Sequence, residues 1–204
     1  MRYLSLGTGA IIGIVAGSVV LFAIIVYFIW YITTKNGLIS LRNDMEEAYS
    51  AMDVHMKKRY DLIPNLVETC KGYAKFEQDT LVGITQARNA AIAASPKDKA
   101  AAESALNSEL RTLLNVVQER YPDLKASTQF NNLSKQLENC EHEIGNARKY
   151  YNAKVKILNN KIEKFPSSHV ARRMGLERKP YFEIADAERN APQVSFDDSP
   201  KVRL

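Results

Sequence analysis

The sequence predicts an all-α protein, in which an N-terminal transmembrane helix precedes an elongated antiparallel four-helix bundle and a partly extended C-terminal tail. Three observations support this fold class. One stretch of 23 residues is entirely apolar or small, and later apolar residues recur at alternating intervals of three and four. No segment shows the sustained alternation of a β-strand. The 204 residues are enough for one domain with its own core.

The apolar stretch runs from Ala10 to Ile32, and Arg2 is the one charged side chain in the first 34 residues. As a helix it would be about 34 Å long, which is enough to cross the hydrocarbon core of a bilayer. A helix also satisfies its own backbone hydrogen bonds in lipid. Tyr27, Trp30 and Tyr31 near its end are typical of the headgroup region. We therefore expect one transmembrane helix.

The main alternative for this stretch is a cleaved signal peptide. Such a peptide has a shorter apolar core, followed by a small-residue cleavage site that this sequence lacks. We therefore interpret the stretch as a retained anchor. Lys35 and Arg42 follow it, whereas the N-terminal side carries Arg2. By the positive-inside rule, the C-terminal part is expected in the cytoplasm, although the difference in charge is small.

Proline and capping residues predict four helices after the anchor. Asp61 to Pro64 have the order of an N-cap and a first turn, and Ser95-Pro96 repeats that order. Tyr121-Pro122 and Phe165-Pro166 predict helix ends, because the residue before proline avoids the helical region. The membrane helix either breaks near Gly37 or continues through it. The four helices are expected at residues 38–60, 62–94, 97–120 and 128–164.

Apolar stripes along these helices predict how they pack. The longest stripe consists of Phe130, Leu133, Leu137, Cys140, Ile144, Ala147, Tyr151, Val155, Leu158, Ile162 and Phe165. Short connections make neighbouring helices antiparallel, so we expect an up-down-up-down bundle with the stripes inside. Its longest helices would reach about 50 Å, which predicts a rod. If the rod stands upright on the membrane, Phe165 lies near the bilayer; the rod could also lie flat.

The predicted domains follow from these boundaries. They are an N-terminal tail at 1–9, the transmembrane helix at 10–32, the bundle at 36–165 and a C-terminal tail at 166–204. Within the last of these, a short helix is expected near 167–174 and an extended segment at 191–196. The final residues, 197–204, are rich in charge and are expected to be disordered.

Composition and motifs argue against several function classes. After the anchor, Lys and Arg exceed Asp and Glu by only four, so a concentrated nucleic-acid-binding surface is not expected. The sequence has three histidines and no CxxC pair, HExxH motif or glycine-rich phosphate loop. We therefore predict no nucleic-acid partner, no metal, no cofactor and no catalytic residue, and do not expect an enzyme.

Three polar or reactive residues of the expected helices have specific interpretations. Cys70 and Cys140 lie on apolar faces and are interpreted as small buried side chains, while a disulfide between them is left open. Glu77 interrupts the stripe of the second helix. We expect it to pair with a Lys or Arg of a neighbouring helix. The alternative is a buried acid with a shifted pKa, which would serve an enzyme.

Two kinds of surface are candidates for contacts with partners. Gly9, Gly13 and Gly17 recur every four residues, and their shared face would let two membrane helices approach closely. Basic side chains are candidates for contact with a partner or with anionic lipid. They are Lys57, Lys58, Arg59, Arg172, Arg173, Arg178 and Lys179. The alternative for the first three is a solvated helix end, where positive charge suits the helix dipole.

Several sequence segments between about residue 36 and residue 196 form a characteristic set. They are IPNL at 63–66, KGYA at 71–74, YPDLKAS at 121–127, ARKYYNAKV at 147–155 and APQVSF at 191–196. With this set the chain resembles the LemA family of bacterial membrane proteins. Tyr49 and His55-Met56 depart from the usual family pattern of Trp and Gln-Leu, which affects the expected packing only locally.

The resemblance implies an N-terminal anchor in the bacterial inner membrane and a cytoplasmic antiparallel helical bundle. It brings no established enzymatic activity. Family members are often encoded beside HtpX-type membrane zinc metalloproteases, which suggests a role in membrane protein quality control. Our leading hypothesis is a scaffold or adaptor whose partners are the lipid bilayer, further copies of the chain and such a protease. The alternatives are a sensor of anionic lipid surfaces and an enzyme of unknown activity.

Overall fold

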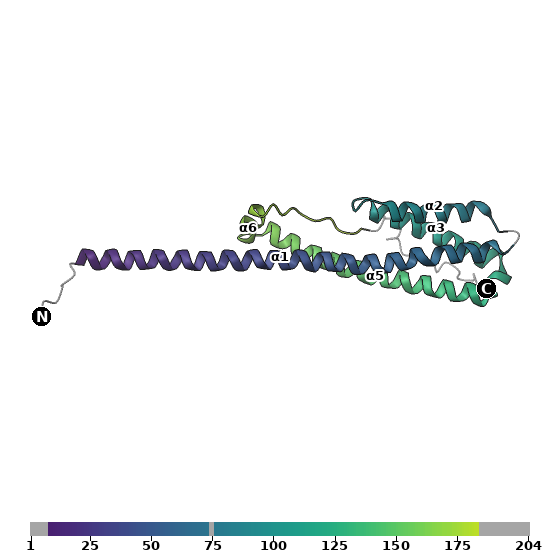
Figure 1. Cartoon of the computed structure of the whole chain (residues 1–204), viewed down its shortest axis with the longest axis horizontal. Coiled ribbons are helices and arrows are strands. Elements are labelled where there is room, and N and C mark those ends of the chain that lie inside the picture. Colours follow the sequence, from purple (N-terminus) through teal and green to yellow (C-terminus); the bar gives the residue numbers. More distant parts are fainter. Residues whose placement is uncertain (1–7, 74–75, 184–204) are drawn as a thin grey trace, which may run out of the picture. The chain divides into compact units, whose positions relative to one another are not determined.

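A computed structural model of the chain describes residues 8–73 and 76–183 (Figure 1). Every regular element in these residues is a helix, which confirms the predicted all-α class. The helices are α1 (Thr8–Lys71), α2 (Gln78–Ala93), α3 (Lys99–Arg120), α4 (Pro122–Ala126), α5 (Thr128–Glu163) and α6 (Ser167–Arg173). The segments at 1–9, 191–196 and 197–204 for which the sequence makes predictions lie wholly or largely outside the described residues.

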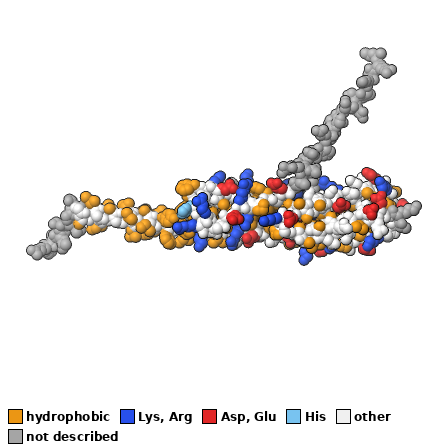
Figure 2. Space-filling view, turned by 90° about the horizontal axis from the view of Figure 1, so that it is seen from above, with side chains coloured by type: hydrophobic (Ala, Val, Ile, Leu, Met, Phe, Trp, Pro, Cys, Tyr) orange, Lys and Arg blue, Asp and Glu red, His pale blue; other side chains and the backbone are white. Residues whose placement is uncertain are grey.

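Helix α1 contains the apolar stretch. It is the one helix of the described residues that is long and apolar enough to cross a membrane, and its apolar window has no buried side chain. A core helix of a soluble protein would have buried that window. Figure 2 shows the exposed hydrophobic side chains along this part of the chain. Of the two possibilities at Gly37, the helix continues through it.

Helix α1 also continues through Pro64, where the sequence predicts a helix start, so that prediction is wrong. Proline has no N–H to donate to the carbonyl four residues earlier, which here belongs to Tyr60. Arg88 of α2 donates to that carbonyl instead, from Nε at 2.6 Å. The expected helix at 62–94 is therefore divided: its first residues extend α1, and α2 begins after a turn that ends at Glu77.

The chain forms two compact units, and the first comprises residues 1–50 and 149–181. In it, the Lys154 ammonium lies 3.0 Å from a carboxylate oxygen of Asp44, and the Tyr49 and Tyr151 rings meet edge to face at 5.7 Å. These contacts join α1 to α5. Leu38, Met45 and Ala48 of α1 are buried here.

The predicted short helix of the tail is α6, and it ends at a glycine. Gly175 has a φ of 65°, a conformation that glycine adopts without strain, and the Leu176 N–H donates to the Ala171 carbonyl at 3.0 Å. Beyond it the chain has no regular secondary structure up to residue 183. The Asn159 amide holds this segment, because it both donates to and accepts from the Lys179 backbone at 2.9 Å.

The second unit comprises residues 51–148 and 182–204. Four helical segments form its core: the end of α1, then α2, α3 and the first part of α5, with consecutive segments running in opposite directions (Figure 1). The predicted stripe of α5 is buried from Phe130 through Leu137 and Cys140 to Ile144. The short helix α4 adds Leu124, which is fully buried. This arrangement agrees with the predicted antiparallel bundle.

Candidate functional site

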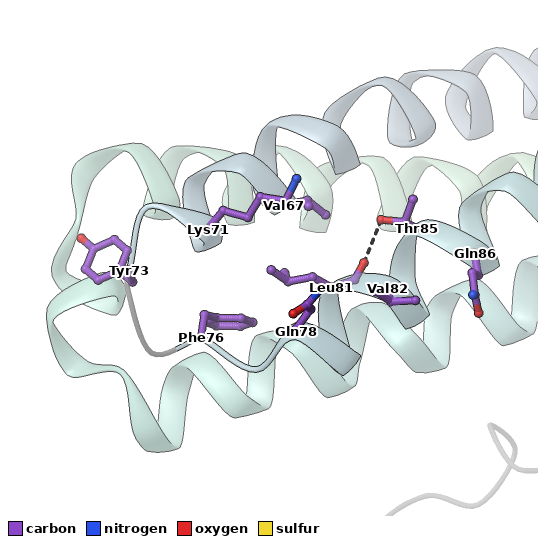
Figure 3. Close-up of a pocket in the computed structure, with 9 residues that line it drawn as sticks. All are labelled: Val67, Lys71, Tyr73, Phe76, Gln78, Leu81, Val82, Thr85 and Gln86. Atoms are coloured by element: carbon purple, nitrogen blue, oxygen red, sulfur yellow. Dashed lines mark hydrogen bonds between the residues drawn. The ribbon is translucent and has the colours of Figure 1, made fainter.

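An apolar groove lies in the second unit where α1 ends and α2 begins (Figure 3). Its volume is about 550 Å³, within the range of pockets that bind small ligands or side chains. Val67 of α1 and Leu81 of α2 face each other across it, and Phe76 of the turn lies at one end. Val82 is 44% exposed, so apolar surface is accessible to a partner.

The turn beside this groove is held by contacts with α3 and its following loop. Glu77 pairs with the Arg120 guanidinium of α3, which confirms that it forms an ion pair with a neighbouring helix. The Phe76 and Tyr121 rings stack with centroids 4.9 Å apart. Both contacts come from residues outside α1 and α2, so α3 and Tyr121 hold Phe76 and Glu77 beside the groove.

The groove is suited to binding rather than to acid–base chemistry. Its ionisable lining groups are Lys71 and Tyr73, with no carboxylate among its described lining residues. The Lys71 ammonium already lies 2.7 Å from the Glu68 carboxylate, and the Thr85 hydroxyl donates to the Leu81 carbonyl at 2.8 Å. The lining is therefore mainly apolar, as in pockets that bind ligands, and the described lining residues include no activated nucleophile.

A network of buried charges joins three helices of the second unit. The Arg59 guanidinium, 1% exposed, pairs with Glu103 of α3 and with Glu141 of α5. Asn107 accepts a hydrogen bond from Arg59 at 3.1 Å and donates one to Glu141 at 2.7 Å. Since a buried ion is stable only when paired and hydrogen-bonded, this network fixes the register of α1, α3 and α5.

The structure contradicts the predicted contact of Arg59 with a partner or with lipid, because its guanidinium is in the interior. Its neighbours Lys57 and Lys58 are exposed, and their proposed contact role stays a prediction. Arg59 lies one turn from the buried Met56 and Ile63, so its helical phase was the available sign.

Tyr60 and Lys99 extend the network. The Tyr60 hydroxyl donates to Glu103, and burial, together with this carboxylate, raises the pKa of Tyr60 above its ordinary value. The Lys99 ammonium lies 5.2 Å from the centroid of the Tyr60 ring and donates to the Ala91 carbonyl at 2.8 Å. Lys99 therefore satisfies a carbonyl at the C-terminal end of α2, where a positive charge is favourable.

The two cysteines are buried and unbonded, as expected of small apolar side chains. Burial raises the pKa of the Cys70 thiol from 9.0 to about 12, and raises that of Cys140 in the same direction. Both groups therefore stay protonated at neutral pH and are poor nucleophiles. The described residues also contain no group of three or more His, Cys, Asp or Glu that could hold a metal ion.

The remaining candidate residues lie in the first unit and do not form one cluster. Arg172 and Arg173 are exposed in α6, whereas Arg178 lies 3.6 Å from the Glu163 carboxylate. The backbone of Lys179 is held by Asn159, and its side chain is partly covered. The glycines that share one face of the apolar stretch are exposed, and a Cβ on any of them would meet no atom within 4 Å.

Two comparisons identify the family of this chain. A family model described as LemA matches residues 48–196. A curated relative, the protein LemA of Metamycoplasma hominis, is 31% identical over 167 residues, which are 81% of this chain and 75% of the relative. The chain belongs to the LemA family. This confirms the resemblance found in the sequence.

The LemA match covers the groove beside Phe76 and the charged network around Arg59, which lie in the second unit. It also covers the turn between α5 and α6, in the first unit. The apolar stretch with its three glycines precedes the matched residues, so its assignment rests on this chain's own sequence. LemA is not known as a family of enzymes.

Proposed function

We propose that this LemA protein is a membrane-anchored helical scaffold or adaptor. One observation carries the proposal: the exposed apolar stretch and residues of both folded units belong to the same uninterrupted helix, α1. Because this helix has no break, it connects its contacts within the membrane directly to the helices that follow. In this proposal the chain crosses the bacterial inner membrane once, with its C-terminal part in the cytoplasm.

Within the membrane, the proposed contact is a second copy of the chain. Gly9, Gly13 and Gly17 share one face of α1, and their Cα atoms leave room for another helix backbone. No atom of the described chain occupies that room. In lipid, close packing of this kind is a main source of helix association, because the hydrophobic effect does not distinguish helix from lipid tail.

In the cytoplasm, the proposed contact is an apolar side chain of a membrane-associated partner, bound in the groove lined by Val67, Leu81 and Val82. A partner of the HtpX-type protease class fits the family's genomic neighbourhood and would place the chain in membrane protein quality control. The support for this part is the accessible apolar surface and the absence of reactive groups among the residues that line the groove.

Chemical cross-linking of the full chain in native membranes tests self-association. The test variant is Gly13→Leu, and the matched control is Val15→Leu, which adds one methylene on the opposite face. Because a Cβ at Gly13 meets nothing within 4 Å, the substitution leaves the chain's own packing intact. We expect a several-fold loss of cross-linked oligomer for Gly13→Leu alone. A wild-type chain that is strictly monomeric would contradict the proposal.

A further inference from the structure

We propose that the turn between α5 and α6 is a second membrane contact, in which the Phe165 ring enters the headgroup region and nearby basic side chains bind the phosphates of anionic lipids. This turn comprises residues 164–166, between the end of α5 at Glu163 and the start of α6 at Ser167. The inference rests on the proposed function in one respect: α1 must span the bilayer.

The exposure of Phe165 is the first observation. Its side chain is 87% exposed, whereas the most exposed large hydrophobic residues of the apolar stretch, Ile12 and Phe22, reach 69%. Single exposed apolar residues are common on soluble proteins, so exposure alone decides nothing. The location of the Phe165 ring is what suggests a membrane contact, because the ring lies beside the end of the apolar stretch.

A hollow in the first unit shows that location. It is lined by Trp30 and Thr34 of α1 on one side and by Lys164 and Phe165 of the turn on the other. Trp30 belongs to the aromatic residues that end the apolar stretch, and such residues mark the lipid–water interface. The turn therefore lies next to the part of α1 that is at the interface when the helix spans the membrane.

Charge around the turn is complementary to anionic lipid. Residues 161–173 contain four Lys or Arg and one acid, Glu163, which itself lies 3.6 Å from Arg178. The four cations, all exposed, are Lys161, Lys164, Arg172 and Arg173. No ion pair joins any of them to an acid of the described residues. On α1, no Asp or Glu occurs before Asp44.

Figure 2 shows Lys and Arg side chains where the hydrophobic part of α1 gives way to the rest of the first unit. An exposed aromatic ring surrounded by cations is the combination that binds the surface of an anionic bilayer, since the ring enters the interface and the cations meet phosphates. Long Lys and Arg side chains also reach headgroups from slightly different depths. Lipid is therefore the partner whose chemistry fits this corner.

Fluorescence quenching in bilayers of defined composition tests the proposal, because Trp30 is the one tryptophan of the chain. The test chain is Phe165→Trp with Trp30→Phe, reconstituted at full length into vesicles of phosphatidylcholine with one third phosphatidylglycerol. A fraction of the lipid carries bromine on its acyl chains as the quencher. The matched control is Tyr150→Trp with Trp30→Phe, since Tyr150 is an exposed aromatic residue of α5 that lies about 20 Å before the end of this helix.

We expect the tryptophan introduced at position 165 to be quenched several-fold more strongly than the one at position 150. Changing Lys161, Lys164, Arg172 and Arg173 together to Gln should reduce this quenching in the anionic vesicles towards its value in pure phosphatidylcholine. Equal, weak quenching at positions 165 and 150 would overturn the proposal, as would a response unaffected by removal of the four charges.

The wild-type chain separates this result from the proposed function. Trp30 should be quenched by the same brominated lipids, because it ends the apolar stretch. If Trp30 is quenched and position 165 is not, the second contact is overturned while the anchor remains. If Trp30 is also unquenched, both the second contact and the membrane span are overturned.

Discussion

Arg88 donates a hydrogen bond from Nε to the backbone carbonyl of Tyr60, at 2.6 Å, and this is the carbonyl that Pro64 leaves without a helical donor. The two residues are on different helices, 28 positions apart in the chain. The contact explains how α1 passes through a proline without ending. It also joins α2 to α1 at the level of the buried charge network.

This relationship predicts an unequal effect of one substitution in two backgrounds. Arg88→Ala leaves the buried Tyr60 carbonyl unpaired and should lower the free energy of unfolding by about 1–3 kcal/mol. In a Pro64→Ala background, the restored backbone N–H can donate to that carbonyl, so Arg88→Ala should cost clearly less. Chemical denaturation of the full chain, followed by circular dichroism, measures both. Equal costs in the two backgrounds would contradict the explanation, and Gln86→Ala on the exposed side of α2 is the control.

The charge network predicts a sharp contrast between adjacent cations. Arg59→Ala removes the partner of two carboxylates, Glu103 and Glu141, and should lower the free energy of unfolding by about 3–5 kcal/mol. Lys58→Ala, one residue away and exposed, should change it by less than about 0.5 kcal/mol. Similar losses for the two variants would show that Arg59 is not the interior ion that the structure places there.

The contacts of Arg88 and Arg59 also show which features of the fold the sequence does not predict. Because helical periodicity is local, the sequence predicts the α5 stripe correctly over most of its length, whereas Phe165, its last predicted member, lies beyond the end of α5 and is exposed. The pairing of Glu77 follows from a charge within an apolar series. The local order around Pro64 predicts a helix start, and this prediction fails because the compensating donor, Arg88, belongs to another helix. The sequence does not distinguish Arg59 from Lys57 and Lys58, because the acids that pair with it are distant in the chain. Long-range polar contacts overrode the local rule in both cases.

The buried thiols predict slow chemical modification. Cys70 is fully buried, and its pKa is raised to about 12, so the folded chain holds very little reachable thiolate at pH 8. We expect iodoacetamide to label Cys70 only after unfolding. Mass spectrometry of the full chain in detergent, with and without urea, measures the labelling. Rapid labelling of the native chain would contradict the burial described for Cys70.

The same pKa shift predicts how stability depends on pH. The unfolded chain releases the Cys70 proton near pH 9.0, whereas the folded chain retains it until about pH 12. The stabilisation is therefore complete below pH 9 and is lost as the pH rises through that window, by roughly 1.4 kcal/mol per pH unit for one group. Cys70→Ala should make the fall less steep in denaturation experiments between pH 9 and pH 11. An unchanged slope would contradict the assignment.

The groove predicts a loss of partner contact without a loss of stability. Val82→Glu places a charge in a groove whose wall is 44% exposed at that residue, so the free energy of unfolding should change by less than about 0.5 kcal/mol. Cross-links to membrane partners should decrease. Val54→Glu is the control, because Val54 is 66% exposed and does not line the groove. Equal cross-linking by the two variants would contradict the proposed role of the groove in binding a partner.

The most direct test of a membrane-anchored helical scaffold is alkaline carbonate extraction of membranes that contain the full chain. Carbonate releases proteins held at the surface by charge, and leaves proteins that span the bilayer in the pellet. Because the apolar window of α1 has no buried side chain, we expect the chain to stay entirely with the membrane pellet. Recovery of the intact chain in the soluble fraction would contradict the central claim.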